Sequence, residues 1–382
     1  MTIVFQDTKW GAAAPQTHVL VIGVGEYSYI VGGKAFNPGT PLCAGLRQLS
    51  SSVPSAREFA NWVIAHLDNP AAPLGSVEVA LSPGSFEDAS GQVTIVDTAT
   101  SAGINKAFDA WYERCDQSES NVAIFYFCGH GLENKITMML LPEDFGATPK
   151  RLGDEIIDFT TTSYAMAECK AKCQLYLLDA CRDPSLEITQ GIVVPRSLKS
   201  TTKMFFPPRD AYILNAAPQG GKAHAPSNGV SFFTSALIRC LDKLGAGNRN
   251  GALWEVTTDS LASSMVERSQ FAVADGTAPV SGLCTRGGSS SFATVIHQFA
   301  HPAEVMTKID CRPITALPYA HLTIEKDCTP VKQRSAAADP WLCEIEAGTY
   351  DIRAQFPSGK YASNKLEQAI LYPPLQRLTI PV

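Results

Sequence analysis

The first two thirds of the chain alternate two kinds of apolar pattern. Continuous apolar runs, typical of strands that are buried on both faces, occur at residues 18–25, 76–81, 121–128, 174–179 and 211–215. Apolar residues spaced three and four apart predict helices at residues 55–67, 104–115, 164–170, 232–244 and 254–268. Strands that alternate with helices predict an α/β fold, in which helices cover both faces of a mostly parallel sheet.

The pattern changes after about residue 300. Short strand candidates separated by proline and glycine turns occur at residues 305–310, 321–325, 342–346, 350–356 and 378–382. No helical period survives there, so we predict a small all-β, sandwich-like accessory domain at residues 300–382. The main domain is then expected at residues 18–299, after an N-terminal lead segment at 1–17.

Composition excludes several classes of protein. The chain has 382 residues, of which 45% are hydrophobic, so it can bury a sizeable core and is not a disordered protein. The net charge is −6, from 31 basic and 37 acidic residues without a charge block, which disfavours nucleic acid as a partner. No apolar run approaches the roughly 20 residues of a membrane helix, and the first ten residues lack the features of a signal peptide. The eleven cysteines are scattered and odd in number, which predicts reduced thiols in a cytoplasmic protein.

Candidate chemistry follows two of the predicted strands. His130 stands in Cys-Gly-His-Gly after the strand at 121–128, and Cys181 stands in Asp-Ala-Cys-Arg-Asp after the strand at 174–179. Neighbouring parallel strands end at the same edge of a sheet, about 4.8 Å apart, so the two side chains are expected to face each other. We predict Cys181 as a nucleophile, His130 as its general acid and base, and the backbone N–H groups of Gly131 and Cys181 as an oxyanion hole.

Four stretches together resemble the caspase-like cysteine peptidases, the clan of caspases, metacaspases and paracaspases. They read HVLVIGVGEY, FYFCGHG, LYLLDACRD and GVSFFTSALI, and the resemblance spans residues 18–295. His130 precedes Cys181 by about 50 residues, as in the caspase pattern. The resemblance implies an α/β sheet of about six strands flanked by helices, and hydrolysis of peptide bonds in protein substrates with no metal or cofactor in the chemistry.

The same resemblance bears on substrate choice. Asp179 stands where caspases have a glutamine and where metacaspases and paracaspases have an aspartate that lines the pocket for an Arg or Lys side chain. A carboxylate there would attract a cation and repel an acidic side chain. Ser55 aligns with a second pocket aspartate of metacaspases, so half of the acidic pocket is expected to be missing. Ala216 begins the segment where relatives build the substrate groove, and His224 in that segment is expected to be a surface residue.

The stretch at residues 184–209 lacks periodicity and is expected to be an exposed linker. In caspase relatives this linker is often cut to activate a zymogen. We therefore predict self-processing after one of its basic residues, which are Arg196, Lys199, Lys203 and Arg209. Arg182 is expected to pair with Asp183 or with the loop backbone. Prokaryotic caspase-like proteins with appended domains often serve stress responses or antiphage defence, and the resemblance implies the same setting here.

Metal sites are weaker hypotheses. Cys169 and Cys173 could chelate zinc in a metal-thiolate protein, but no second ligand pair follows them. Glu143 and Asp144 lie near where metacaspases place part of a calcium site. Two carboxylates fall short of the six to eight oxygens that calcium takes, so calcium activation is an alternative to a solvated turn, and no metal site is predicted.

One further alternative concerns the whole protein. The chain could be a catalytically silent caspase-like scaffold whose β domain binds a protein partner. A regulatory partner could also bind the β domain of an active peptidase.

Overall fold

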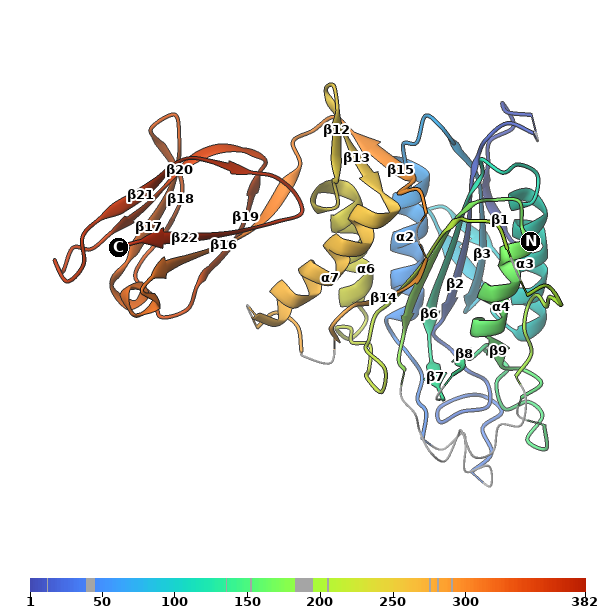
Figure 1. The fold of residues 1–382 in the computed structure, drawn as a ribbon. Coiled ribbons are helices and arrows are strands. Elements are labelled where there is room, and N and C mark those ends of the chain that lie inside the picture. The colour runs from blue at the N-terminus through green and yellow to red at the C-terminus, as the bar shows by residue number, and fades with distance from the viewer. Residues whose placement is uncertain are drawn as a thin grey trace.

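The computed structural model describes residues 1–11, 13–38, 45–134, 136–151, 153–182, 195–204, 206–274, 276–279, 282–289 and 291–382. Its centre is a seven-stranded sheet in the order β1-β3-β2-β6-β10-β11-β14 (Figure 1). The five inner strands are parallel, and they are β2 (Thr17–Val24), β3 (Leu74–Ser82), β6 (Val122–Gly129), β10 (Cys173–Ala180) and β11 (Asp210–Asn215). The edge strands β1 (Ile3–Gln6) and β14 (Thr285–Ser289) run antiparallel to their neighbours.

Helices cover both faces of this sheet, as the apolar pattern predicts. One apolar core lies under α2 (Ser52–His66), α6 (Phe232–Arg239), the π-helical turn Cys240–Leu244 and α7 (Thr258–Ala274). The other lies under α3 (Ser101–Cys115), α4 (Phe159–Ala165) and the 3-10 turn Met166–Glu168. Every residue of β2, β3, β6 and β10 is buried, which explains why these strands are continuous apolar runs.

Three small sheets extend the main domain. They are β4 (Ser85–Glu87) with β5 (Val93–Ile95), β7 (Gly131–Glu133) with β8 (Met138–Leu140) and β9 (Ile157–Asp158), and β12 (Asn248–Asn250) with β13 (Leu253–Thr257) and β15 (Val295–Phe299). Strand β7 begins two residues after β6 ends, so the chain around His130 runs from the central sheet directly into a second one.

Two expectations differ from the structure. The central sheet has seven strands instead of about six, because the edge strands β1 and β14 were not predicted. The helix predicted from residue 254 was placed too early, since β13 occupies that stretch and α7 begins at Thr258. Strand β13 forms because it pairs with β15, about 40 residues further along the chain. The side chain of Thr257 then accepts the backbone N–H of Ser260 at 3.1 Å and caps the helix that follows.

The C-terminal region is rich in strands, as expected. One sheet has the order β19-β16-β22 and the other β18-β17-β20-β21, with an apolar core of their own. The strands are β16 (Glu304–Arg312), β17 (His321–Lys326), β18 (Thr329–Arg334), β19 (Trp341–Glu346), β20 (Gly348–Gln355), β21 (Asn364–Leu371) and β22 (Leu375–Pro381). A 3-10 turn, Ile314–Tyr319, follows β16.

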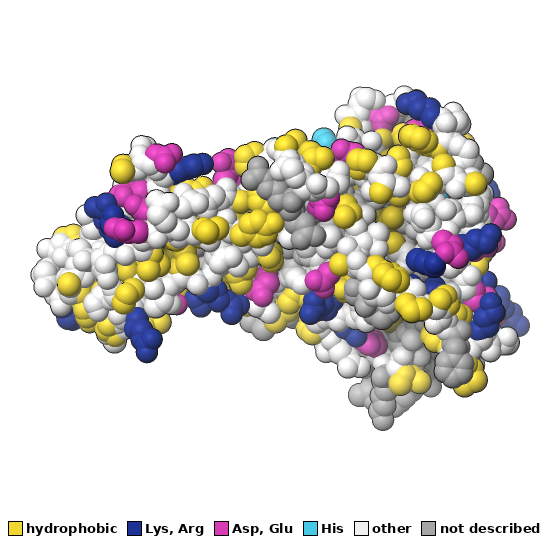
Figure 2. All heavy atoms as spheres, turned by 45° about the horizontal axis from the view of Figure 1, so that its top comes forward, with side chains coloured by type: hydrophobic (Ala, Val, Ile, Leu, Met, Phe, Trp, Pro, Cys, Tyr) yellow, Lys and Arg dark blue, Asp and Glu magenta, His cyan; other side chains and the backbone are white. Residues whose placement is uncertain are grey.

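The C-terminal region lies beside α6 and α7 and is remote from α3 and α4 (Figure 1). Ion pairs join it to the main domain: the Arg239 guanidinium pairs with Glu344 and, at 2.6 Å, with Glu304. Basic and acidic side chains are interspersed over the face shown in Figure 2, without a large area of one sign. No helix in the described part of the chain combines the length and apolar character that a membrane crossing needs.

Candidate active site

A cleft of about 320 Å³ opens where β6 and β10 end. The two strands are parallel neighbours, and their register pairs Cys128 with Asp179 and Gly129 with Ala180. The loops that carry His130 and Cys181 therefore leave the sheet side by side. The side chains of Asp179, His130 and Cys181 all line this cleft, so the structure brings together the three residues singled out at the two strand ends.

His130 is held from two directions. Its backbone N–H donates to the Tyr27 hydroxyl at 2.7 Å, and its Nε2 lies 2.7 Å from the carbonyl oxygen of Arg47. A carbonyl can only accept a hydrogen bond, so Nε2 carries the hydrogen and Nδ1 is the nitrogen that can accept a proton in the neutral ring. Burial lowers the pKa of His130, and the bond to Arg47 opposes that shift. The imidazole is thus suited to act as a base at neutral pH.

Cys181 is half-buried and follows β10 directly. None of the ten described cysteines forms a disulfide, so Cys181 is present as a thiol or thiolate. Its loop is anchored by the next residue: the Arg182 N–H donates to Gly221 at 2.9 Å, and the Arg182 carbonyl accepts from Gly220 at 3.0 Å. These bonds hold the nucleophile candidate on a backbone that is tied to a neighbouring loop.

The Arg182 side chain reaches a residue that sequence reasoning missed. Its guanidinium donates to both carboxylate oxygens of Glu133 on β7, at 2.6 and 2.8 Å. The only signal in the sequence is an acidic residue three positions after His130. The pairing with Asp183 was a prediction, and Asp183 lies outside the described residues. The Glu133–Arg182 pair links the loop after Cys181 to the strand after His130.

Gly131 sits where these two loops come closest. A Cβ atom on Gly131 would lie 2.6 Å from the carbonyl oxygen of Cys181, which is too near for any side chain. The close approach explains the glycine after His130. It also keeps the Gly131 backbone beside the Cys181 loop, where an oxyanion hole built from their N–H groups is predicted.

Asp179 is a buried carboxylate, 3% exposed, at the inner end of the cleft. Its Oδ2 accepts hydrogen bonds from the hydroxyls of Ser231, of Thr234 at 2.8 Å and of Tyr126 at 3.4 Å. Burial raises the pKa of Asp179, and the hydroxyl groups oppose that shift. Among the described residues, the largest influences on this pKa are burial and four neutral hydrogen-bond partners, and none is a lysine or arginine. A cation supplied by a ligand would therefore be favoured there.

Two predicted pocket residues lie behind the cleft wall. Ser55 is fully buried; its hydroxyl donates to the Ser51 carbonyl at 2.8 Å and accepts the Ser231 N–H at 2.9 Å. Ser52, almost one helical turn earlier, lines the cleft instead. Ala216 is also buried, and its N–H donates to the Leu178 carbonyl at 2.9 Å.

The segment after Ala216 does reach the cleft, through residues 223–227. They include His224, which we expected at the surface and which is half-buried beside His130 and Cys181. No pattern in the sequence distinguishes His224 from a surface histidine, because its place depends on how the loop folds back over the strand ends.

The basic residues of the predicted linker differ in exposure. Lys203 is 65% exposed, and Lys199 lies over the Tyr112 ring at 4.7 Å. The Arg196 side chain is exposed, but its backbone bonds to Ile156 at 2.9 Å and to Asp158 at 2.8 Å. The expectation of an exposed loop is wrong for Arg209, which is 7% exposed and stacks over Phe206. Residues 183–194 lie outside the described residues.

The candidate metal ligands have other partners. The Glu143 carboxylate accepts from the Ser28 hydroxyl, and Asp144 accepts the Ser101 N–H at 2.7 Å. Cys169 and Cys173 are buried, and burial raises the pKa of both thiols. Within the described ranges, no three His, Cys, Asp or Glu side chains are grouped as metal ligands would be.

Comparisons with known proteins identify the family of the chain. The chain matches the family model of the caspase domain over residues 19–278. It is 27% identical over 295 residues to the uncharacterized protein y4kE of Sinorhizobium fredii, covering 76% of this chain and 85% of that protein. The crystal structure of caspase-1 from Spodoptera frugiperda aligns with a TM-score of 0.41 and 13% identity, covering 74% of this chain and 89% of that one. Since the family model spans well over half of its residues, the chain belongs to the caspase domain family and has a protease-type function.

Proposed function

We propose that the protein is a cysteine endopeptidase in which Cys181 attacks the scissile carbonyl and His130 moves the proton. Nδ1 of His130 takes the proton from the Cys181 thiol, and the sulfur bonds to the carbonyl carbon. The C–N bond then breaks as the same proton passes to the leaving amine. A water molecule, deprotonated by His130, cleaves the thioester and restores the thiol. The N–H groups of Gly131 and Cys181 stabilise the oxyanion in both steps.

One observation carries this proposal: the two side chains line one cleft at neighbouring strand ends, with His130 in the tautomer that leaves Nδ1 as the base. The lowered pKa of His130 supports the role, since a base must be unprotonated at the working pH. The family membership supports it independently.

Cleavage after Lys or Arg is the proposed specificity. The support is Asp179, a buried carboxylate at the inner end of the cleft. Three hydroxyl groups donate to Oδ2, and the Cys128 thiol is a further hydrogen-bond partner of the carboxylate, so a substrate cation would meet a carboxylate that is already held in place. An aspartate side chain would be repelled there by like charge.

The experiment compares fluorogenic peptides with Lys, Arg, Asp or norleucine before the cleaved bond. Wild type should cleave the Lys and Arg peptides, and Cys181→Ala and His130→Ala should reduce kcat/KM by at least about 10³-fold. Cys328→Ala is the matched control, because its thiol is exposed in the C-terminal region and does not line the cleft. If wild type is no faster than Cys181→Ala on peptides and on unfolded protein, the chain is the silent scaffold instead.

The zymogen hypothesis is part of the same proposal. Self-processing requires that one linker bond reach the cleft of its own or another molecule. Lys203 is the leading candidate, because its side chain is 65% exposed and its backbone bonds to the hydroxyls of Thr201 and Tyr164, whereas the Arg196 backbone pairs with the backbone of Ile156 and Asp158. A role in stress or antiphage defence stays a prediction from the resemblance.

A further inference from the structure

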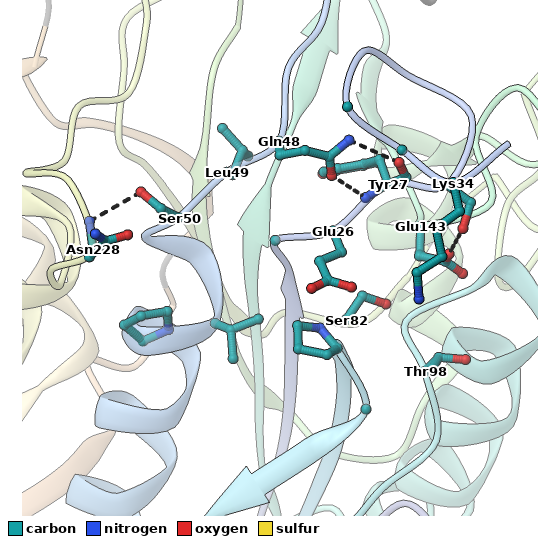
Figure 3. A pocket seen from close by; sticks show the side chains of 18 of the residues that line it. Glu26, Tyr27, Lys34, Gln48, Leu49, Ser50, Ser82, Thr98, Glu143 and Asn228 are labelled. Carbon is teal, nitrogen blue, oxygen red and sulfur yellow. Dashed lines mark hydrogen bonds between the residues drawn. The ribbon is translucent and has the colours of Figure 1, made fainter. Parts of the chain in front are cut away.

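The segment that carries the Arg47 carbonyl lies between two cavities. We call residues 47–50 the strap. On one side of the strap is the cleft of His130 and Cys181, and on the other a cavity of about 710 Å³ (Figure 3). Gln48, Leu49 and Ser50 line both cavities. Leu49 packs against the apolar core under α3 and α4. The other residues of the strap have open space on two sides, so their position depends mainly on hydrogen bonds.

The Gln48 side chain supplies three of those bonds. Its Oε1 accepts the Tyr27 N–H at 2.7 Å, and its Nε2 donates to the carbonyl oxygens of Tyr27 at 3.0 Å and Val31 at 3.1 Å. Figure 3 shows the amide directed at the Tyr27 backbone, away from the centre of the cavity. The Gln48 amide thus bonds both the N–H and the carbonyl of Tyr27, in the way that the backbone of a neighbouring strand would.

Three further contacts hold the strap. A parallel β-bridge pairs Arg47 with Val31. The Leu49 N–H donates to the Gly25 carbonyl at 2.9 Å, and the Ser50 hydroxyl accepts the Asn228 N–H at 3.1 Å. A Cβ atom on Gly25 would lie 2.8 Å from the Leu49 carbonyl oxygen, so the strap passes as close to the loop after β2 as a glycine permits. The hydrogen bonds therefore fix the strap against a rigid neighbour.

Tyr27 connects the strap to His130. Its backbone holds Gln48, and its buried hydroxyl accepts the His130 N–H at 2.7 Å. Its ring centroid lies 5.0 Å from that of His130. One residue therefore supports both the imidazole and, through Gln48, the carbonyl that receives its Nε2–H. Gln48 also donates to Val31, the residue that forms a β-bridge with Arg47. Loss of the Gln48 bonds would therefore loosen both supports of the acceptor and let it shift relative to the ring.

We propose that Gln48 is a positioning residue which, through Tyr27, keeps the Arg47 carbonyl on Nε2 of His130 and so reserves Nδ1 for the Cys181 proton. The proposal rests on the proposed function. Gln48 need not touch substrate to act in this way. It raises the fraction of molecules in which the His130 ring has the orientation and the tautomer that catalysis needs. A misplacement of about 1 Å of a catalytic group costs on the order of 100-fold in rate.

The experiment replaces Gln48 by Leu, which removes all three hydrogen bonds at similar size, and by Glu, which keeps only the acceptor. Gln376→Leu is the matched control, because Gln376 makes one bond, to Tyr372 at 3.1 Å, in the C-terminal region. We expect Gln48→Leu to lower kcat about 10- to 100-fold with KM nearly unchanged, Gln48→Glu to lower it less, and Gln376→Leu to leave it unchanged.

A second measurement separates positioning from a merely structural role. With ¹⁵N-labelled histidine, NMR should show wild-type His130 protonated on Nε2 and Gln48→Leu as a mixture of tautomers. The proposal is overturned if Gln48→Leu keeps the wild-type kcat. It is also overturned if Gln48→Leu loses activity through a changed KM and a lower thermal midpoint while the tautomer of His130 stays the same. If Gln48→Leu does not fold, the same comparison is made on Gln48→Glu.

Failure of the proposed function gives a different result. An inactive wild type that equals Cys181→Ala removes the peptidase proposal, while the ¹⁵N signals of His130 still report whether Gln48 controls its tautomer. If wild type is active and the Gln48 variants have the same kcat, only the positioning role of Gln48 is removed.

Discussion

The Arg182 guanidinium and the Glu133 carboxylate form a two-pronged ion pair, with N–O distances of 2.6 and 2.8 Å. Their side chains are 17% and 11% exposed, so solvent screens the pair only weakly. Arg182 follows the proposed nucleophile, and Glu133 lies three residues after His130. Arg182 also donates to the Thr285 hydroxyl on β14 at 3.2 Å. The pair thereby joins the two loops of the site and the edge strand of the sheet.

Glu133→Gln should lower both stability and activity, because it leaves the Arg182 charge partly buried without its partner. Removal of one member of a buried ion pair lowers the free energy of unfolding by about 3–5 kcal/mol. Because Glu133 and Arg182 are still partly exposed, we expect a loss near the lower end of this range. Urea unfolding and kcat/KM test this prediction together. Arg286→Gln is the control, since its contact with Asp259 is at the surface and 3.9 Å long. Equal effects of Glu133→Gln and Arg286→Gln would contradict it.

Asp179→Asn should abolish the preference for a basic residue before the cleaved bond. The amide keeps the size of the carboxylate but removes the charge that attracts the cation. We expect kcat/KM for the Lys peptide to fall by at least about 10-fold relative to the norleucine peptide. Asp88→Asn changes an exposed carboxylate and serves as the control. A preference that survives in Asp179→Asn would assign specificity to another part of the cleft.

Activity should be lost on acidification with a midpoint below pH 6.5. Burial lowers the pKa of His130 from its ordinary value of 6.5. Above the lowered pKa the ring is neutral and can take the Cys181 proton, and as pH falls through that value the ring becomes cationic and cannot. The pH profile of kcat/KM on the Lys peptide measures this limb. A midpoint above pH 6.5 would mean that a negative group, not burial, dominates the environment of His130.

The folded state should lose stability between pH 6.5 and 4. Burial lowers the pKa of both His18 and His297 to about 4. In this window the unfolded chain binds protons at both positions while the folded chain does not, so acidification favours unfolding. Each histidine contributes a slope of up to about 1.4 kcal/mol per pH unit. Urea unfolding from pH 7 to 4.5 should show a smaller slope for His297→Gln than for wild type, and an identical slope would contradict the prediction.

Self-processing, where it occurs, should follow Lys203 and spare Arg209. Lys203 is 65% exposed, whereas Arg209 is 7% exposed and donates to the Met166 carbonyl. A protease must bind an extended segment, so a buried residue next to a central strand is a poor substrate. Mass spectrometry of wild type should find a fragment that ends at Lys203 and that disappears in Cys181→Ala and in Lys203→Gln. A fragment that ends at Arg209 would contradict the prediction, because it would mean that the buried backbone around Arg209 becomes accessible to a protease.

The inner strands of the sheet could be predicted from the sequence because each is covered on both faces, and two-sided burial leaves a continuous apolar run such as that of β6. Because the runs show where each strand ends, they also located His130 and Cys181, the residues that follow two of these ends. The edge strand β14, with the sequence TRGGS, has no apolar signal and is a strand only because β11 pairs with it.

The finer parts of the site depend on contacts between distant segments. Ser52 lines the cleft and Ser55 does not, because Ser55 lies almost one helical turn further along α2, where the Ser231 backbone covers its hydroxyl. Glu133 owes its place to Arg182, and Gln48 owes its place to Tyr27 and Val31, and no local pattern encodes such hydrogen bonds. The sequence by itself determined which strands are buried and which residues follow them, since burial acts residue by residue. Only the tertiary structure decided which side chains surround the thiol and the imidazole, since loops are held by pairwise contacts that form when the sheet has assembled.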